Sequence, residues 1–104
     1  MSKTLSIIIP AYNEERTVLH LLSKLEEVNL DENIGMQLII VDDASTDNTS
    51  SLIDSYINDH PEIDICFKRH QVNQGKGAAL HTGIAAASGD YIICLLYTSD
   101  AADE

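Results

Sequence analysis

The spacing of apolar residues changes several times along this chain of 104 residues. Leu5–Ile9 is a short, largely apolar and β-branched run ended by Pro10, which has no N–H to donate to a central ladder, and this predicts a first strand. Apolar residues then recur at spacings of three and four, which is typical of a helix packed on a sheet. These residues are Val18, Leu21, Leu22, Leu25 and Val28.

Polar residues around this stripe predict where its helix begins and ends. Asn13 is suited to the N-cap position, and Glu14 and Glu15 would then lie near the positive end of the helix. A polar linker over residues 29–35 follows the stripe, and the apolar run Gln37–Val41 after it predicts a buried second strand.

The same alternation continues through the middle of the chain. A second helix is predicted between its cap candidates Ser45, Thr46 and Asp47 and the His60–Pro61 pair that ends it. Its buried face would carry Leu52, Ile53, Tyr56 and Ile57.

Three further elements are predicted before residue 94. Apolar and polar residues alternate over residues 63–67, which indicates a third and more exposed strand. An alanine-rich helix over Gly77–Ala87 can pack close to a sheet and is closed by Gly89, and Tyr91–Ile93 begins a fourth strand. Strands that alternate with single helices form right-handed crossovers, so we expect an α/β fold with a Rossmann-like parallel sheet.

Composition narrows the classes of partner and compartment. Six Lys and Arg against seventeen Asp and Glu give a formal charge of -11, which argues against binding nucleic acid through its phosphates. Cys66 and Cys94 show no metal or disulfide spacing, and a reducing cytoplasm fits best. The first residues lack the apolar core of a signal peptide, and no apolar run approaches the roughly 20 residues that span a bilayer. The histidines, also without ligand spacing, are interpreted as surface or structural residues: His20, His60, His70 and His81.

Asp42 and Asp43 directly follow the second apolar run, where the chain leaves the core. In open α/β sheets this edge is where ligands bind. Carboxylates there can accept hydrogen bonds from a nucleobase or a ribose, or hold a divalent metal. The alternative is that they cap a turn and the next helix, because Asp is common at both positions. The pair taken alone favours this second interpretation, and only the surrounding motifs can overturn it.

Parallel topology brings two further loops to the same edge. After the first strand, a rigid proline turn presents Tyr12 and Glu14, which suit a base and a ribose, although a tyrosine taken alone is more often a packing residue. Before the third helix, Gly75 and Gly77 let backbone N–H groups approach a ligand, and Lys76 adds a positive charge. This loop lacks the P-loop and GxGxxG spacings, and a simple glycine turn before a helix would account for it too.

Four stretches taken together resemble the family 2 glycosyltransferases. They are IIIPAYNEE, LIIVDDASTDNT, NQGKGAAL and SGDYI, in this order between Leu5 and Ile93. Within the family the resemblance is to polyprenyl- and dolichyl-phosphate mannose and glucose synthases. It implies the nucleotide-diphospho-sugar transferase type of Rossmann-like sheet, truncated here after about four strands. The implied activity is transfer of a hexose from a nucleotide-diphosphate sugar to an acceptor such as a polyprenyl phosphate.

The resemblance also implies a set of nucleotide-sugar contacts: Pro10, Tyr12, Glu14, Ile40, Asp42, Gly75 and Lys76. In this set Asp42 accepts hydrogen bonds from the base, Ile40 flanks the base, and the glycine loop closes over the nucleotide. Asp43, Ala44 and Ser45 would instead shape their loop and start the next helix.

The chain departs from the family pattern after Ile93. The resemblance implies an Asp-x-Asp motif there that binds Mg²⁺ or Mn²⁺, and the chain reads CLLYTSDAADE instead. These residues, Cys94–Glu104, resemble the translation of a transposase-type sequencing-library adapter. We therefore expect residues 1–93 to be the N-terminal nucleotide-binding half of a glycosyltransferase domain and residues 94–104 to be a non-native tail.

The resemblance implies no catalytic residue and no metal ligand within the chain, so the isolated segment is expected to be inactive. The parent enzyme would work with Mg²⁺ or Mn²⁺ in the cytoplasm, at the membrane face if its acceptor is a lipid phosphate. Two other functions remain open. One is a non-catalytic nucleotide-binding module, and the other is a nucleotidyltransferase, which would normally carry a glycine-rich basic loop after its first strand.

Overall fold

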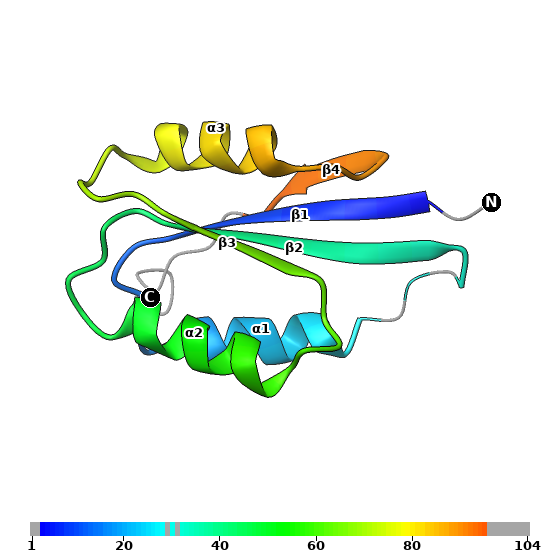
Figure 1. Ribbon diagram of the computed structural model, residues 1–104, viewed down its shortest axis with the longest axis horizontal. Helices are drawn as coiled ribbons and strands as arrows, with labels where there is room; N and C mark the ends of the chain where they lie inside the picture. The colour runs from blue at the N-terminus through cyan, green and yellow to red at the C-terminus, as the bar shows by residue number, and fades with distance from the viewer. Residues whose placement is uncertain (1–2, 29, 31, 96–104) are drawn as a thin grey trace, which may run out of the picture.

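The computed structural model describes residues 3–28, 30 and 32–95, which form a parallel sheet covered by helices (Figure 1). Along the chain the elements are β1 (Lys3–Ala11), α1 (Val18–Glu26), β2 (Ile34–Asp42), α2 (Thr49–Asp59), β3 (Ile65–Arg69), α3 (Lys76–Ala86) and β4 (Tyr91–Cys94). The strand order is β3-β2-β1-β4, and the three pairings are parallel. The predicted alternation and the Rossmann-like sheet are confirmed.

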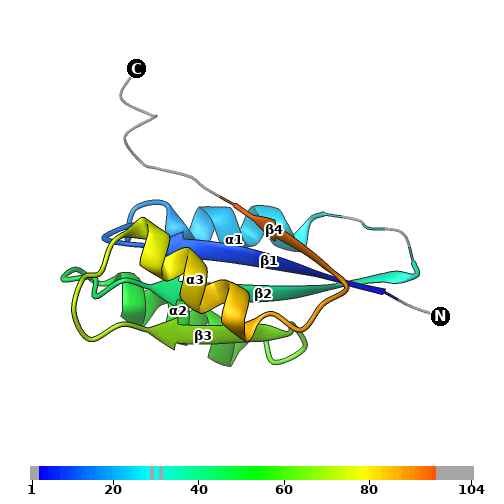
Figure 2. The ribbon, with the colours of Figure 1, turned by 90° about the horizontal axis from the view of Figure 1, so that it is seen from above.

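Alternate residues of the two central strands supply a core on each face of the sheet, because successive side chains of a strand point to opposite sides. Figures 1 and 2 show α1 and α2 on one face and α3 on the other. The core beneath α1 and α2 consists of Ile7, Ile9, Val18, Leu22, Leu38, Ile40, Ile53 and Tyr56. The core beneath α3 consists of Ile8, Ile39, Val41 and Ala79.

Small residues let α3 lie close to the sheet. Ala79 is fully buried, and a Cβ built on Gly83 would come within 2.4 Å of Ile8 Cγ2. A side chain at Gly83 would therefore force the helix or the strand to move. The close packing predicted for this alanine-rich helix is confirmed, and the helix begins and ends one residue earlier than predicted.

The first strand does not end at Pro10, as the sequence predicted, but continues to Ala11. Every second residue of β1 hydrogen-bonds toward β4, and the carbonyl oxygens of Thr4 and Ile8 are acceptors in this series. Pro10 is the next residue in the series, but pairing with β4 stops at Ile8 and Cys94. The missing N–H of Pro10 therefore lies beyond the end of β4, where a central strand tolerates proline.

The first helix begins at Val18, so the prediction that Asn13 caps it is wrong. Thr17 occupies the N-cap position and makes no side-chain hydrogen bond to the helix. Asn13 has a φ of 51°, a left-handed conformation that asparagine tolerates better than most residues. Its side chain bonds to a different loop, at the edge of the sheet described below.

The strands β3 and β4 form the two edges of the sheet, and β3 is partly exposed, as predicted. Tyr91, Ile92 and Ile93 of β4 are 52%, 45% and 46% exposed. Cys94 completes β4 and Leu95 packs on the core beneath α1 and α2, whereas residues 96–104 of the predicted tail lie outside the described residues. The non-native origin of that tail stays a prediction. In the described part of the chain, no helix has both the length and the apolar composition needed to cross a bilayer.

Candidate functional site

The loops that follow β1, β2 and β3 meet at one edge of the sheet, where the carboxyl ends of the parallel strands lie (Figure 1). In the register of the sheet, Ala11 lies opposite Asp42, and Asp42 lies opposite Arg69. The ends of the three strands are therefore level. This confirms that parallel topology brings the predicted loops together, although they are far apart in sequence.

Asn13 joins the first of these loops to the second. Its backbone N–H donates to Ser45 Oγ at 2.8 Å. Its side-chain Oδ1 accepts from the N–H of Thr46 at 2.8 Å and from that of Asp47 at 3.3 Å. Asn13 thus caps the loop before α2, and not the helix that follows it in sequence.

Glu14 and Glu15 strengthen the same connection. The N–H of Glu14 donates to Thr49 Oγ1 at 2.7 Å, and Glu15 Oε1 accepts from the N–H of Asn48 at 3.0 Å. The half-buried carboxylate of Glu14 accepts from the hydroxyl of Thr17 at 3.2 Å. The loops after β1 and β2 therefore form one hydrogen-bonded unit at the starts of α1 and α2.

Asp42 and Asp43 send their carboxylates to opposite faces of the sheet edge. Ile40 packs beneath α1 and α2 and Val41 beneath α3, so the alternation of the strand places Asp42 with Ile40 and Asp43 with Val41. Both carboxylates are nearly buried, with 2% and 4% of each residue exposed. Neighbours in sequence therefore serve different loops.

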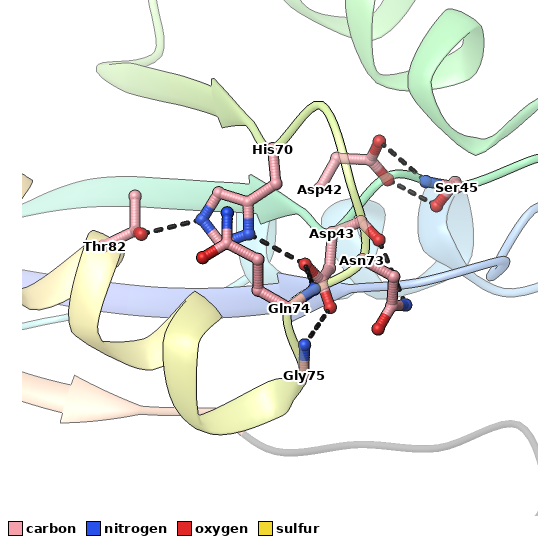
Figure 3. A network of polar contacts seen from close by, with 8 residues as sticks. All are labelled: Asp42, Asp43, Ser45, His70, Asn73, Gln74, Gly75 and Thr82. Atoms are coloured by element: carbon pink, nitrogen blue, oxygen red, sulfur yellow. Dashed lines mark hydrogen bonds and ion pairs between the residues drawn. The ribbon is translucent and has the colours of Figure 1, made fainter.

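The carboxylate of Asp42 closes its own turn (Figure 3). Its Oδ2 accepts from the N–H of Ser45 at 3.3 Å, and its Oδ1 accepts from the hydroxyl of Ser45. Between them Ala44 has a φ of 62°, a left-handed conformation uncommon outside glycine and asparagine. The predicted role of Ala44 and Ser45 in shaping this loop is confirmed.

The carboxylate of Asp43 accepts three hydrogen bonds from the loop before α3 (Figure 3). Oδ1 accepts from the N–H of Gln74 at 2.9 Å and from His70 Nδ1 at 2.8 Å, and Oδ2 accepts from the N–H of Gly75 at 2.8 Å. Gly75 is the N-cap residue of α3, and its φ of 98° favours glycine. Asp43 therefore caps a helix, but the helix is α3 and not the next one in sequence.

These contacts determine the ionisation of Asp43. Burial raises the pKa of its carboxyl, but the hydrogen bonds from the N–H of Gln74, from His70 and from the N–H of Gly75 outweigh burial. The pKa of Asp43 consequently lies below its ordinary value. The group is an ionised acceptor at neutral pH.

His70 connects this carboxylate to the body of α3. Its Nδ1 lies 2.8 Å from Asp43 Oδ1, its Nε2 lies 2.7 Å from Thr82 Oγ1, and its side chain is 9% exposed. The interpretation of His70 as a structural residue is thus confirmed, but its connecting role was missed. The one sequence signal for it is its position directly after a strand, at the same edge as Asp42.

The remaining predicted contacts divide into exposed and buried residues. Tyr12 is 45% exposed in the loop after β1, and Lys76 is exposed at the first position of α3, next to Gly75. Pro10 is buried within β1. Ile40 is fully buried beneath α1 and α2, and its implied contact with a base stays a prediction.

A divalent metal does not fit the residues that the structure describes. Among them, no three histidine, cysteine, aspartate or glutamate side chains gather closely enough to hold one. Asp42 and Asp43 face different loops, so the pair does not present a shared oxygen cage. The chemistry of the described edge is that of hydrogen bonding, aromatic contact and charge.

That chemistry suits a ligand with a flat polar ring and an anionic group. Tyr12 offers an exposed aromatic ring, and the nearly buried carboxylate of Asp42 lies at the same edge. Lys76 places an exposed positive charge at the start of α3. A nucleotide combines the two ligand features.

Comparison with known proteins points to one family. Residues 6–95 match the family described as Glycosyl transferase family 2. The chain is 36% identical to a dolichyl-phosphate beta-glucosyltransferase of Dictyostelium discoideum, over 96% of this chain and 32% of that protein. It is also 36% identical to a poly-beta-1,6-N-acetyl-D-glucosamine synthase of Staphylococcus epidermidis, over 88% of this chain and 21% of that protein. The chain thus spans about a third and about a fifth of the length of these curated relatives.

Solved structures agree with this match. A mannosyltransferase of Pyrobaculum calidifontis in complex with GDP-Man and Mn²⁺ is similar with a TM-score of 0.81 and 26% identity, over 88% of this chain and 26% of that chain. Glucosyl-3-phosphoglycerate synthase of Mycobacterium tuberculosis, in complex with Mn²⁺, uridine diphosphate and glucosyl-3-phosphoglycerate, is similar with a TM-score of 0.66 and 28% identity. That alignment covers 89% of this chain and 33% of the synthase chain. The described sheet corresponds to part of each of these proteins.

Proposed function

This chain belongs to glycosyl transferase family 2, and on that premise we propose that it forms the nucleotide-binding part of a hexosyltransferase. The whole protein would transfer a hexose from a nucleotide-diphosphate sugar to an acceptor. The observation that carries the proposal is the convergence of three family motifs on the carboxyl edge of β1, β2 and β3. In open parallel sheets this edge is the ligand site.

We propose that Asp42 and Tyr12 hold the base. Each carboxylate oxygen of Asp42 takes one hydrogen bond from Ser45. A carboxylate oxygen has two acceptor positions, so each still accepts an N–H from uracil or guanine without releasing Ser45. The exposed ring of Tyr12 supplies a stacking surface. Pro10 would fix the turn that presents this ring, and Ile40 would support the base from within the strand.

We propose that the start of α3 and the loop after β1 hold the rest of the nucleotide. Gly75 leaves room for a close backbone approach, because nothing lies within 4 Å of a Cβ built there. Lys76 follows it with an exposed positive charge suited to a phosphate. Glu14 retains unused acceptor positions for ribose hydroxyls, since its carboxylate takes one hydrogen bond from Thr17.

The acceptor and the metal belong to the proposal for the whole protein. The relatives named for dolichyl phosphate support a lipid phosphate acceptor. We propose that an enzyme with such an acceptor works at the cytoplasmic face of a membrane. The mannosyltransferase and the synthase complexes contain Mn²⁺, which supports Mg²⁺ or Mn²⁺ as cofactor. Such a cation would neutralise the donor diphosphate. Its ligands would come from a segment outside the described residues.

A non-catalytic nucleotide-binding module is the second candidate. The observation that favours it is that Tyr12, Asp42 and Lys76 suit the binding of a nucleotide, and none of them has an assigned role in a chemical step. The genomic sequence beyond the codon for Ile93 separates the two candidates. An Asp-x-Asp motif followed by a later catalytic acid supports the transferase.

Calorimetric titration of the chain with uridine diphosphate, guanosine diphosphate and adenosine diphosphate tests nucleotide binding. We expect one of the first two to bind, and Asp42→Asn to weaken that binding about tenfold, which corresponds to about 1.4 kcal/mol. Asp54→Asn removes the same charge from an exposed site on α2 and is expected to bind normally. Equal and weak heat from all three nucleotides would contradict the proposal.

A further inference from the structure

His70 lies between the end of β2 and α3, two parts of the chain whose relative position matters for the proposed function. On one side of its ring is Asp43 at the end of β2, and on the other is Thr82 in the middle of α3 (Figure 3). Neither side-chain contact is needed to complete the sheet, because the backbone N–H of His70 already donates to the backbone carbonyl of Asp42 at 2.9 Å. The side chain is therefore available for a separate task.

The direction of the hydrogen bonds follows from the groups involved. An ionised carboxylate only accepts, so His70 Nδ1 carries the proton that it shares with Asp43. In a neutral imidazole the other nitrogen is then an acceptor, and the hydroxyl of Thr82 donates to Nε2. The chain of donors runs from Thr82 through His70 to Asp43. For the neutral ring these roles specify the tautomer with its proton on Nδ1.

This chain of hydrogen bonds fixes the carboxylate of Asp43 in the orientation that the next loop needs. Oδ1 serves both His70 and the N–H of Gln74, and Oδ2 serves the N–H of Gly75. Rotation of the carboxylate would break the bonds to both amides. His70 opposes that rotation because its ring is held from the other side by Thr82.

The same contacts hold α3 at two separate points. Gly75 is its N-cap and Thr82 lies seven residues later, which is about two helical turns or roughly 10 Å along the axis. Asp43 holds the first point and His70 holds the second. A helix held at two points along its axis is fixed both in position along the sheet and in tilt. Lys76 at its start is consequently fixed as well.

From this arrangement we infer that His70 is a positioning residue, which through Asp43 and Thr82 sets where Gly75 and Lys76 meet the nucleotide. The inference rests on the proposed nucleotide site, since Lys76 and Gly75 are its phosphate-side residues. His70 itself would not touch the nucleotide.

Two variants interrupt the hydrogen-bond chain in different ways. Thr82→Val keeps the size of the side chain and removes the donor to His70, and Thr82→Ser restores the donor. His70→Phe removes both hydrogen bonds and keeps a ring. His81→Phe makes the same substitution at an exposed position of α3 and is the matched control.

The measurements are amide hydrogen exchange of Gln74 and Gly75 without nucleotide, and calorimetric affinity for uridine diphosphate and guanosine diphosphate. We expect Thr82→Val to speed exchange at both amides about fivefold and to weaken nucleotide binding by a similar factor, the usual effect of one lost hydrogen bond. Thr82→Ser should restore both values, and His70→Phe should exceed Thr82→Val in both. In the unsubstituted chain at pH 8, ¹⁵N shifts should show His70 protonated on Nδ1 alone.

The outcomes separate the inference from the function that it rests on. If the unsubstituted chain binds nucleotide and Thr82→Val binds equally well, the positioning role is wrong and the proposed function stands. Faster exchange without any rescue by Thr82→Ser also overturns the positioning role, because a general loss of structure would produce it. If the unsubstituted chain binds neither nucleotide, the proposed function fails and the inference fails with it.

Discussion

The backbone N–H of Gly75 donates to Asp43 Oδ2 at 2.8 Å, across 32 positions of sequence. Gly75 has no side chain with which to cap α3, and the helix has no acidic residue in its first turn. The end of β2 therefore supplies the acceptor that this helix start lacks. A single carboxylate joins the central sheet to the helix on its other face.

Acid is expected to weaken the hydrogen bonds between the Asp43 carboxylate and the start of α3. Because the pKa of Asp43 is lowered from its ordinary 3.8, the stability it contributes is present above pH 3.8 and is lost as the pH falls through the lower folded-state value. Asp43→Asn should cost about 1–3 kcal/mol at neutral pH, since buried donors lose their charged acceptor. It should also reduce the loss of stability on acidification. Urea unfolding from pH 7 to pH 3 measures both effects.

Asp47 accounts for acid dependence that this variant retains. Burial raises the pKa of Asp47, but hydrogen bonds from the hydroxyl and the N–H of Thr49 outweigh burial and lower it. Asp54→Asn, on the exposed side of α2, is the control for the loss of one charge. An acid slope in Asp43→Asn equal to that of the unsubstituted chain would contradict the assignment.

Two substitutions of Asn13 are expected to separate backbone strain from lost hydrogen bonds. Asn13→Gly keeps the left-handed φ of 51° at no steric cost but removes the acceptor for Thr46 and Asp47. Asn13→Ala loses the acceptor and adds strain, so it should be less stable than Asn13→Gly by about 1 kcal/mol. Chemical denaturation of the two variants gives the difference. Equal stabilities would show that the left-handed backbone costs alanine nothing here.

Gly83→Ala is expected to destabilise the protein by about 1–3 kcal/mol, although alanine is the better helix former. The added Cβ would lie 2.4 Å from Ile8 Cγ2 and push α3 away from the sheet. Gly77→Ala is the control, because nothing lies within 4 Å of a Cβ there. Thermal unfolding should rank Gly77→Ala above the unsubstituted chain and Gly83→Ala below it. A double variant of Gly83→Ala with Ile8→Ala that loses less stability than the two single variants together would confirm that the clash is the cause.

The exposed edge strand β4 is expected to cause self-association. Tyr91, Ile92 and Ile93 are each about half exposed on a strand at the edge of the sheet that the structure describes. Ile92→Lys should raise the dissociation constant about tenfold, because an isoleucine buried between chains contributes about 1.5 kcal/mol. Sedimentation velocity over a concentration series measures this. Val72→Lys, at a 65% exposed loop position, should leave the constant unchanged, and an equal effect there would indicate repulsion by charge alone.

The sequence predicts α1, α2, β1 and β2 well because each of them carries a local pattern of apolar residues. The stripes with spacings of three and four become α1 and α2, and the apolar runs become β1 and β2. The level ends of these strands also follow from parallel topology, which is why Asp42 and the loops beside it could be placed together.

Contacts between distant residues are what the sequence does not reveal. Asn13 is of a residue type that commonly caps the helix following it in sequence. Its side chain instead accepts from the N–H groups of Thr46 and Asp47, which the sheet brings near. His70 and Thr82 have no distinctive spacing, and their link through Asp43 exists only when α3 lies on the sheet. Pro10 was predicted to end its strand because the sequence does not show how far β4 pairs along β1.

The dependence of α3 on Asp43 sets an order in which this chain folds. A peptide over residues 73–88 contains three glycines and no acceptor for its first amides, so it should be largely unstructured alone in water. The helix gains its cap only after β1 and β2 have paired and Asp43, at the end of β2, lies in its final position. We therefore expect α3 to be the last helix to acquire amide protection during refolding. The amides at its Gly75–Lys76 end should become protected after those in the core of the sheet.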